Sequence, residues 1–393
     1  MNDIKVIKIK PGIQHYTWGG SSYIPAWLRL ENPDRQPFAE AWYGDHPLAP
    51  AVADENLVPL NQLIGNAPEI FLGKESLDTY GTRLPFLLKI LDVKDMLSLQ
   101  LHPDKIGAMA GFELENKAGI PLNAANRNYK DQNHKPELLY ALSDFWMLQG
   151  FVPLDTIRTR FESLVPEFAL PKALSWRSLM QVIWGLDGPT YMTYTQTLQN
   201  NLVKHNTDDK NQIYHWISKA FKQYPPHAAS IDRGLLVMLM LHVQYLSPGQ
   251  VGYQAPGVLH AYLEGQNVEL MANSDNVLRG GLTPKHIDPE ELMKHLDTKA
   301  RGQCILQPIY LMDDEVAFNP PVNDFGLKYF NVGLGRSKDI QYETASILLN
   351  KSGRLKCGDI TVNKGEAILI PAYTPVRVES ITPAEYFLSI SSL

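Results

Sequence analysis

The sequence predicts a mainly β protein with one helical insertion, and three observations carry that prediction. Short apolar segments bounded by Gly, Pro and Asn fill residues 1–103, as expected of strands and turns, and after an irregular stretch at residues 104–130 such segments return at Glu137–Leu142 and from Gln244 onward. Between residues 154 and 242, apolar residues recur with helical spacing. Two segments of the strand-rich parts also resemble each other, which indicates a duplicated β unit.

Length and pattern together predict three domains. A chain of 393 residues is too long for one ordinary core. We expect a discontinuous first β domain, a helical domain and a C-terminal β domain, which comprise residues 1–153 with 243–300, residues 154–242, and residues 301–393, respectively.

Individual elements follow from the local pattern. Met1–Lys10 indicates a first strand, because Lys alternates with Val or Ile. This segment also lacks the apolar core and cleavage site of a signal peptide. The next predicted elements are the strands Leu84–Leu91 and Met96–His102, the short helix Lys105–Lys117, and the strand Glu137–Leu142. The predicted helices of the second domain are Leu154–Leu164, Ala173–Ile183, Met192–Val203, Gln212–Phe221 and the strongly apolar Gly234–Leu241.

The internal similarity joins Pro248–His260 to Lys364–Val376. Each segment has a Gly-led turn, an apolar strand, a break and another strand, with His260 aligned to Val376. This pattern is typical of cupin jelly rolls. It predicts two cupin-type barrels, of which the first kept a metal-binding histidine and the C-terminal one is degenerate.

The composition limits the compartment and the partners. A formal net charge of −6 argues against bulk nucleic-acid binding, although an anionic small substrate could bind in a locally positive pocket. No apolar run approaches the roughly 20 residues of a membrane span. Cys304 and Cys357 could form one disulfide, but two thiols in so long a chain fit a reducing compartment better. We therefore expect a cytoplasmic protein.

A candidate metal site begins with Ser98, Gln100 and His102. These residues share one face of a predicted strand, because successive side chains of a strand point to opposite faces. Glu137 and His260 would complete a set of four nitrogen and oxygen ligands with Gln100 and His102, and such a set suits a zinc-type ion. The alternative is that the histidines are surface or satisfied core residues and that a solvated loop precedes Glu137.

The charge of this site decides its chemistry. A dication with one carboxylate, two neutral imidazoles and one amide keeps about one positive charge. Such a charge suits stabilising an enediolate or polarising a carbonyl or hydroxyl oxygen. A structural zinc is normally closed by four strong ligands, often thiolates, so a glutamine ligand favours a catalytic site with open positions.

Two cationic residues are further candidates. Lys89 interrupts an apolar strand, and it is either an edge-strand lysine that prevents aggregation or a cation that faces the same cleft as Ser98, ready for a phosphate. Arg279 precedes Gly280 and Gly281, so nothing bulky keeps its guanidinium from a buried anion. The alternative for Arg279 is a flexible surface turn.

Seven motifs support a family resemblance, and they are Tyr16–Gly19, Ala39–Trp42, Leu84–Phe86, Gln100–Pro103, Tyr129–Glu137, Pro256–Tyr262 and Met271–Arg279. They run in the order found in the type I mannose-6-phosphate isomerases (phosphomannose isomerases), which the chain closely resembles. The runs Asn-His-Lys-Pro-Glu and Ala-Asn-Ser-Asp-Asn-Val-Leu-Arg are highly specific. The helical segment and the C-terminal third resemble the family only loosely.

The resemblance implies an isomerase that interconverts mannose 6-phosphate and fructose 6-phosphate and feeds mannose and GDP-mannose metabolism. It implies one zinc ion per chain, a cupin-type catalytic core, a helical domain and a C-terminal jelly roll. We expect a monomer whose partner is a phosphosugar, without nucleic-acid or membrane partners. Two alternatives are a non-catalytic two-cupin sugar sensor, against which the charged segment 269–285 argues, and a zinc hydrolase, which would lack the family match.

The resemblance also assigns residues. The family's zinc ligands fall on Gln100, His102, Glu137 and His260, and its catalytic arginine falls on Arg279. Its other active-site positions fall on Lys89, Ser98, His134, Lys135, Glu269, Asp275 and Lys285.

An isomerisation through a cis-enediol needs a base that moves a proton between C2 and C1. The candidates for this base are Glu269, His134 and Asp275. Either Lys135 or Lys285 could assist ring opening or tune the base. The candidates to hold the phosphate are Lys89, Ser98 and Lys285, since binding of the phosphate would position the reacting carbons.

Overall fold

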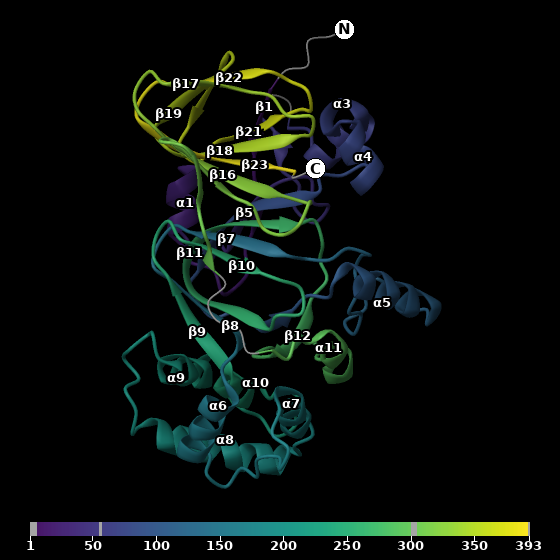
Figure 1. Ribbon diagram of the computed structural model, residues 1–393, viewed down its shortest axis with the longest axis vertical. Helices are drawn as coiled ribbons and strands as arrows, with labels where there is room; N and C mark the ends of the chain where they lie inside the picture. Colours follow the sequence, from purple (N-terminus) through teal and green to yellow (C-terminus); the bar gives the residue numbers. More distant parts are fainter. Residues whose placement is uncertain (1–5, 55–56, 300–304, 392–393) are drawn as a thin grey trace.

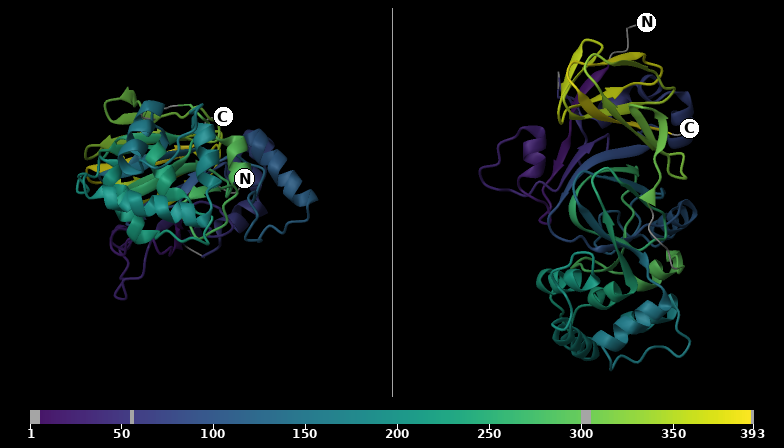
Figure 2. Two further views of the ribbon diagram at one scale, coloured as in Figure 1. Left: turned by 90° about the horizontal axis from the view of Figure 1, so that it is seen from below. Right: turned by 60° about the vertical axis from the view of Figure 1, so that its left-hand side comes forward.

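The structure is a computed structural model that describes residues 6–54, 57–299 and 305–391. Three parts follow one another along its longest axis: a C-terminal β module, a central β module, and a helical domain at the far end (Figure 1). Figure 2 shows the helical domain and the C-terminal module at opposite ends of the molecule. The prediction of a mainly β protein with a helical insertion is confirmed.

The central module is an 11-stranded sheet with the path β13-β10-β7-β11-β5-β3-β2, to which β6, β8, β9 and β12 are joined. The long strand β11 organises it, because its first part pairs with β6 and β8 and its second part with β5 and β7. The strands are β2 Gly12–Gln14, β3 Glu40–Tyr43, β5 Phe86–Val93, β6 Leu99–Leu101, β7 Glu137–Ala141, β8 Phe145–Phe151, β9 Leu241–Leu246, β10 Val251–Gln254, β11 His260–Ala272, β12 Leu278–Gly281 and β13 Ile305–Leu306.

The C-terminal module consists of an eight-stranded sheet, β14-β15-β16-β23-β18-β21-β1-β4, and a four-stranded sheet, β17-β22-β19-β20. Its strands are β1 Ile7–Lys10, β4 Val52–Ala53, β14 Ile309–Met312, β15 Glu315–Phe318, β16 Gly326–Val332, β17 Ser337–Ile340, β18 Ser346–Ser352, β19 Arg354–Cys357, β20 Ile360–Asn363, β21 Ala367–Ile370, β22 Val376–Ser380 and β23 Ala384–Ile390.

Two features of the sheets differ from the expected domain ranges. We expected all of residues 1–153 in the first β domain, but β1 pairs with β21 and with β4 in the C-terminal sheet. Conversely, β13 lies within the expected C-terminal range and pairs with β10 of the central module. An alternating strand pattern shows which face is buried but not which sheet the strand joins, so the ranges missed these exchanges.

The helical domain contains α6 Leu154–Leu164, α7 Trp176–Trp184, α8 Gly188–Leu202, α9 Ile213–Gln223 and α10 Gly234–Val237, followed by the 3₁₀ turn η1 Met238–Met240. The helix predicted for Gly234–Leu241 therefore ends early, and β9 begins at Leu241. Residues 234–241 are all buried. A continuous apolar run of this kind does not distinguish a buried helix from a buried strand by its period.

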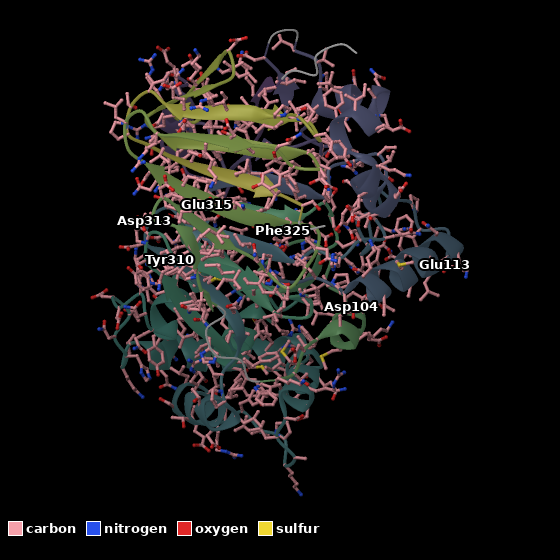
Figure 3. The ribbon with its side chains drawn as sticks, turned by 45° about the horizontal axis from the view of Figure 1, so that its top comes forward. Asp104, Glu113, Tyr310, Asp313, Glu315 and Phe325 are labelled. Atoms are coloured by element: carbon pink, nitrogen blue, oxygen red, sulfur yellow. The ribbon has the colours of Figure 1, made fainter. Side chains whose placement is uncertain are left out.

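Other helices lie outside this domain, and they are α1 Tyr23–Leu28, α2 Leu60–Asn66, α3 Pro68–Leu72, α4 Lys74–Tyr80, α5 Lys105–Lys117 and α11 Pro289–His295. Asp104, labelled in Figure 3, caps α5. It accepts a hydrogen bond of 2.7 Å from the backbone N–H of Gly107. No helix of the described residues is both long and apolar enough to cross a membrane. Cys357 is a buried free thiol, whereas Cys304 lies outside the described residues.

The internal similarity extends to the strand order of both modules. In chain order, β2, β3, β5, β7, β10 and β11 correspond to β14, β15, β16, β18, β21 and β23, and both sets are arranged in space in the same sequence. Gly249 and Gly365, which precede β10 and β21, both have a positive φ, of 93° and 81°. The aligned residues His260 and Val376 each begin a strand.

Candidate active site

His102, Glu137 and His260 form a buried cluster in the central module. Glu137 begins β7, His260 begins β11, and His102 directly follows β6. Their ligand atoms all lie within 4.8 Å of one another. Gln100 pairs with His260 across β6 and β11, so the fourth expected ligand lies beside the cluster.

Hydrogen bonds to backbone carbonyls orient both imidazoles. Nδ1 of His102 lies 2.7 Å from the carbonyl oxygen of Asn276, and Nδ1 of His260 lies 2.9 Å from that of Val258. A carbonyl only accepts, so each Nδ1 carries the proton and each Nε2 presents a lone pair to Glu137. Nε2 of His102 is buried without a hydrogen-bond partner among the described residues. A metal ion would occupy this position, and the donor set fits a zinc-type ion.

The charges of the cluster match the protonation state that metal ligands require. Burial, helped by the Lys135 ammonium, lowers the pKa of His102 to about 4. Burial works to raise the pKa of Glu137, but Lys135 and His102 outweigh it and hold this pKa well below its ordinary value. Nζ of Lys135 lies 2.9 Å from Oε1 of Glu137. At neutral pH the cluster therefore presents a neutral His102 imidazole and a Glu137 carboxylate.

Lys89 lies in the interior beside this cluster. It belongs to β5, which lies between β3 and β11, so it is not the edge-strand lysine of the alternative interpretation. Its Nζ lies 3.2 Å from Oε2 of Glu40 and 3.1 Å from Oε2 of Glu269. Burial works to lower the pKa of Lys89, but Glu40 and then Glu269 raise it above its ordinary value, so Lys89 stays charged.

Glu40 is a site residue that our sequence analysis did not single out. Besides its ion pair with Lys89, it accepts a hydrogen bond of 2.5 Å from Nε1 of Trp42. The signal was present in the motif Ala39–Trp42, which we used only for the resemblance. A buried strand carboxylate of this kind has no pattern that separates it from a solvent-facing one.

Glu269 is the second carboxylate at Lys89. The hydroxyl of Tyr262 donates a hydrogen bond of 2.8 Å to its Oε1. Burial raises the pKa of Glu269 above its ordinary value, and the neighbouring charge of Glu137 adds to this, whereas Lys89 opposes it. Glu269 is therefore closer to the protonated form than an exposed glutamate.

A cavity of about 1040 Å³ lies between the central module and the helical domain. A smaller pocket of about 70 Å³ shares Lys89, Gln100 and Lys135 with it and reaches Glu137, His260 and Glu269. The large cavity brings together these candidate residues of the sequence analysis: Lys89, Ser98, Gln100, Lys135, Asp275, Arg279 and Lys285. The helical domain and its loops contribute Tyr191, Gln223, Tyr224, His227, Ser230 and Asp232.

Arg279 and Lys285 give this cavity a positive side. Arg279 pairs with Gln100 across β12 and β6. Burial lowers the pKa of Arg279, and burial together with the charge of Arg279 lowers that of Lys285. Neither side chain forms an ion pair with any carboxylate of the described residues. These two cations are therefore available to an anionic ligand, unlike Lys89.

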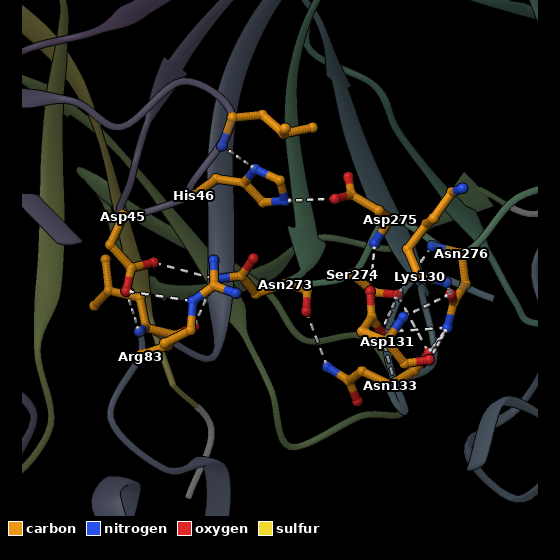
Figure 4. A network of polar contacts seen from close by, with 12 residues as sticks. Asp45, His46, Arg83, Lys130, Asp131, Asn133, Asn273, Ser274, Asp275 and Asn276 are labelled. Carbon is orange, nitrogen blue, oxygen red and sulfur yellow. Dashed lines mark hydrogen bonds and ion pairs between the residues drawn. The ribbon is translucent and has the colours of Figure 1, made fainter. Parts of the chain in front are cut away.

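Asp275 is held at the cavity by His46 (Figure 4). Nε2 of His46 lies 3.1 Å from Oδ2 of Asp275, and Nδ1 of His46 accepts from the backbone N–H of Leu48 at 3.3 Å. Burial works to raise the pKa of Asp275, but the hydrogen bond and charge of His46 lower it. Asp131 fixes the adjoining backbone by accepting the N–H of Asp275 at 2.8 Å.

His134 lies apart from the other candidates. Its Nε2 lies 3.0 Å from Oδ2 of Asp324, a residue of the C-terminal module, and it lines neither of the two pockets. Sequence spacing within Asn133–Glu137 placed His134 beside the metal ligand but could not show that the two side chains diverge.

Comparison with known proteins decides the family. Residues 6–154 match the family described as phosphomannose isomerase type I, catalytic domain. The mannose-6-phosphate isomerase of Escherichia coli (strain K12) is 33% identical over 371 residues, which cover 91% of this chain and 90% of that protein. The chain belongs to the type I phosphomannose isomerase family.

Solved structures of the family have the same fold as this isomerase. The apo form of mannose 6-phosphate isomerase from Salmonella typhimurium has a TM-score of 0.89 and 30% sequence identity, covering 99% of this chain and 100% of that chain. A crystal structure of mannose 6-phosphate isomerase bound with zinc and yttrium matches with the same TM-score, identity and coverage. The resemblance therefore spans the helical domain and the C-terminal module as well.

Proposed function

We propose that this isomerase interconverts mannose 6-phosphate and fructose 6-phosphate with the help of one zinc ion, and so feeds GDP-mannose metabolism. One observation carries the proposal. The buried His102–Glu137–His260 cluster, with ligand atoms within 4.8 Å, adjoins a cavity that is also lined by Arg279 and Lys285, two cations without a carboxylate partner among the described residues. The zinc would be held by Gln100, His102, Glu137 and His260. When bound, it supplies a fixed positive charge for the oxygens of an enediolate.

The phosphate would bind at Lys285 with Ser98. Lys285 has no carboxylate partner among the described residues, and Ser98 lines the same cavity. Lys89 was a third candidate, but Glu40 and Glu269 already neutralise it in the interior. Because Arg279 also lacks a carboxylate partner, its charge can stabilise the negative charge that develops on the substrate in the transition state.

Glu269 is the best-placed base among the three candidates. It lies in the small pocket with Glu137 and His260, and its raised pKa suits a group that both takes and returns a proton at neutral pH. Glu269 is ion-paired with Lys89 as Asp275 is with His46, but the pKa of Asp275 is lowered whereas that of Glu269 is raised. His134 faces Asp324. Glu269 would take the C2 proton and return it to C1 on the same face, while Lys135 assists ring opening.

The two β modules would both be cupin jelly rolls, with the metal site in the central one alone. Their common strand order supports this assignment. The domain ranges 1–153 with 243–300, 154–242 and 301–393 then apply with the strand exchanges described above. A monomeric state and a cytoplasmic location remain predictions, of which the second rests on the low cysteine content.

A coupled assay with mannose 6-phosphate, before and after chelation, tests this function. We expect fructose 6-phosphate to form, the activity to fall with metal content, and added zinc to restore it. Full activity of a metal-free preparation would refute the zinc dependence. Binding of mannose 6-phosphate without turnover would instead indicate a sugar sensor, and release of inorganic phosphate would indicate a hydrolase.

A further inference from the structure

We infer that Asp232 is a positioning residue that couples the helical domain to the turn between Arg279 and Lys285. Asp232 lies in the loop before α10 and lines the large cavity. The inference rests on the proposed function, because that function gives Arg279 and Lys285 their roles.

The Asp232 carboxylate accepts three backbone hydrogen bonds. Oδ1 accepts from the N–H groups of Gly234 at 2.7 Å and Leu282 at 3.0 Å, and Oδ2 accepts from the N–H group of Thr283 at 2.7 Å. Two of these donors belong to the turn after β12, 50 or more positions away in the sequence. Hydrogen bonds to an ionised acceptor are shorter and stronger than neutral ones.

The turn has a backbone conformation that needs such support. Leu282 has a φ of 55°, in the left-handed region that is unfavourable for a residue with a Cβ. Its neighbour Gly281 has a φ of 141°, and a Cβ added there would lie 2.4 Å from Cα of Gly234. The two backbones are therefore in direct contact, and the Asp232 carboxylate bridges them on one side.

Asp232 and its neighbour bond to opposite parts of the molecule. The guanidinium of Arg233 donates to the carbonyl oxygen of Leu186 at 2.8 Å and lies 4.4 Å from the ring centre of Tyr191, so it is anchored in the helical domain. Asp232 reaches the central module instead. Because residues 232 and 233 are adjacent, the position of the helical domain sets the position of the turn.

The position of this turn determines the positions of Arg279 and Lys285. Arg279 lies two residues before Gly281 in β12. On the other side, Oγ1 of Thr283 accepts from the backbone N–H of Lys285 at 3.1 Å. A displacement of the turn would therefore move both cations relative to the metal cluster. Misplacement by about 1 Å can cost about 100-fold in rate.

The Asp232→Asn variant tests this role. It keeps the shape of the side chain but replaces one acceptor oxygen by an amide donor, so at least one of the bonds to the turn is lost. We expect kcat/KM for mannose 6-phosphate to fall about 10- to 100-fold with a raised KM. We also expect unchanged zinc content and faster hydrogen exchange in residues 278–286.

Asp187→Asn is the matched control. Asp187 also accepts a backbone N–H, that of Thr190 at 2.7 Å, but it caps α8 and does not line the cavity. Because Asn caps a helix about as well as Asp, this variant should change the thermal stability little and leave KM, kcat and the exchange of residues 278–286 unchanged. Gly234→Ala provides a second variant, because its new Cβ would lie 2.5 Å from the Leu282 nitrogen while the Asp232 carboxylate stays. It should give the same kinetic pattern as Asp232→Asn.

The inference is overturned if Asp232→Asn lowers the melting temperature but leaves KM, kcat and the exchange of residues 278–286 as in the wild type. Asp232 would then be an interdomain clamp only. A wild-type protein that fails to convert mannose 6-phosphate would refute the proposed function instead. In that case the hydrogen exchange of residues 278–286 still decides whether Asp232 holds the turn.

Discussion

The central and C-terminal β modules share one strand order but differ in their chemistry. Across the strands β6 and β11, Gln100 faces His260. At the corresponding place, across β17 and β22, Ile340 faces Val376. Ile340 and Val376 are both buried in an apolar cluster of the C-terminal module. The same backbone arrangement therefore holds two of the proposed metal ligands in one module and aliphatic core residues in the other.

The registers of the other strands extend this comparison. Glu137 faces Gln254 across β7 and β10 of the central module. In the C-terminal module, Ser346 faces Ile370 across the corresponding strands β18 and β21, so Ser346 occupies the position of the proposed ligand Glu137. Ser346 is buried, and its hydroxyl has no hydrogen-bond partner among the described residues. Leu388 likewise occupies the position of Glu269, because Leu388 faces Leu348 of β18 as Glu269 faces Leu139 of β7.

One polar pair persists in both modules. Lys328 of the C-terminal module corresponds to Lys89, because Lys328 faces Leu388 as Lys89 faces Glu269. By the register of the neighbouring strands, Glu315 corresponds to Glu40. Nζ of Lys328 lies 3.0 Å from Oε1 of Glu315, which Figure 3 shows on the C-terminal sheet. The Lys–Glu ion pair alone therefore does not make a metal site. The proposed metal ligands at the ends of the strands are needed as well.

The connection between two strands makes the second difference. In the central module, the helical domain is inserted in the chain between β8 and β9. The corresponding strands of the C-terminal module, β19 and β20, are joined by a tight turn at residues 358–359. The helical domain supplies one wall of the large cavity. Two changes thus separate the modules, namely a few side chains at strand ends and one long insertion.

The largest effect is expected when His260 of the central module is replaced by valine, the residue at the corresponding position 376 of the C-terminal module. His260→Val should abolish both zinc binding and isomerase activity, because it removes one of the four proposed ligands. The chain should still fold, since valine begins the equivalent strand β22. Elemental analysis should find one zinc per chain in the wild type and none in the variant, in parallel with the coupled assay. His102→Ala should behave in the same way.

Two tightly held ions per wild-type chain would contradict this view, because the C-terminal module would then have kept a metal site. Retained activity of His260→Val without metal would remove the role proposed for the cluster.

Arg279 tests whether the cationic side of the cavity acts in the chemical step. Arg279→Ala should lower kcat by about 10²–10³-fold, as expected when a preorganised charge-stabilising group is lost. KM should change much less, and zinc should stay bound because Arg279 is not a ligand. Arg279→Lys should rescue poorly, since lysine lacks the planar guanidinium. A variant with near-wild-type kcat and a raised KM would show instead that Arg279 only binds the phosphate.

Strand alternation in the sequence put only Gln100 and His102 of the four proposed ligands on one face. Glu137 and His260 were added to complete the set, which the family resemblance also assigned. His102, Glu137 and His260 do come together in the structure. The helices Leu154–Leu164 and Lys105–Lys117 also agree with their predicted limits. Apolar spacing marked the first, whereas the Asp104 cap that begins the second was recognised only in the structure.

Other features depend on long-range packing that local pattern does not contain. The pairing of β1 with β21 brings together residues more than 350 positions apart. Asp232 had no recognisable motif, and its importance follows only from the hydrogen bonds it accepts across the domain boundary. The direction of His134 likewise depends on Asp324, which lies 190 positions away.

The shared ion pair allows a comparison of the modules in stability. Lys89→Met leaves Glu40 and Glu269 buried without their cation, and such a loss typically costs about 3–5 kcal/mol of unfolding free energy. Lys328→Met should cost only about 1 kcal/mol, because Lys328 is partly exposed and Glu315 keeps Lys338 as a partner. Urea denaturation of the zinc-loaded proteins measures both. Equal losses of unfolding free energy in Lys89→Met and Lys328→Met would contradict this prediction, because the buried and the partly exposed ion pair would then contribute equally.

The mildest test places the histidine of the central module in the C-terminal one. Val376 is 3% exposed and lies among apolar side chains, so Val376→His buries an imidazole without a partner. We expect a loss of about 1–3 kcal/mol in unfolding free energy at pH 8. Burial lowers the pKa of a histidine in the folded state, so the unfolded chain takes up the proton first and the loss should grow as the pH falls below about 6.5. Val376→Thr, which is polar but does not titrate, should show no such pH dependence. Binding of a second zinc ion by Val376→His would show that one side chain suffices to restore a site, and the difference between the modules would then lie at Val376 alone.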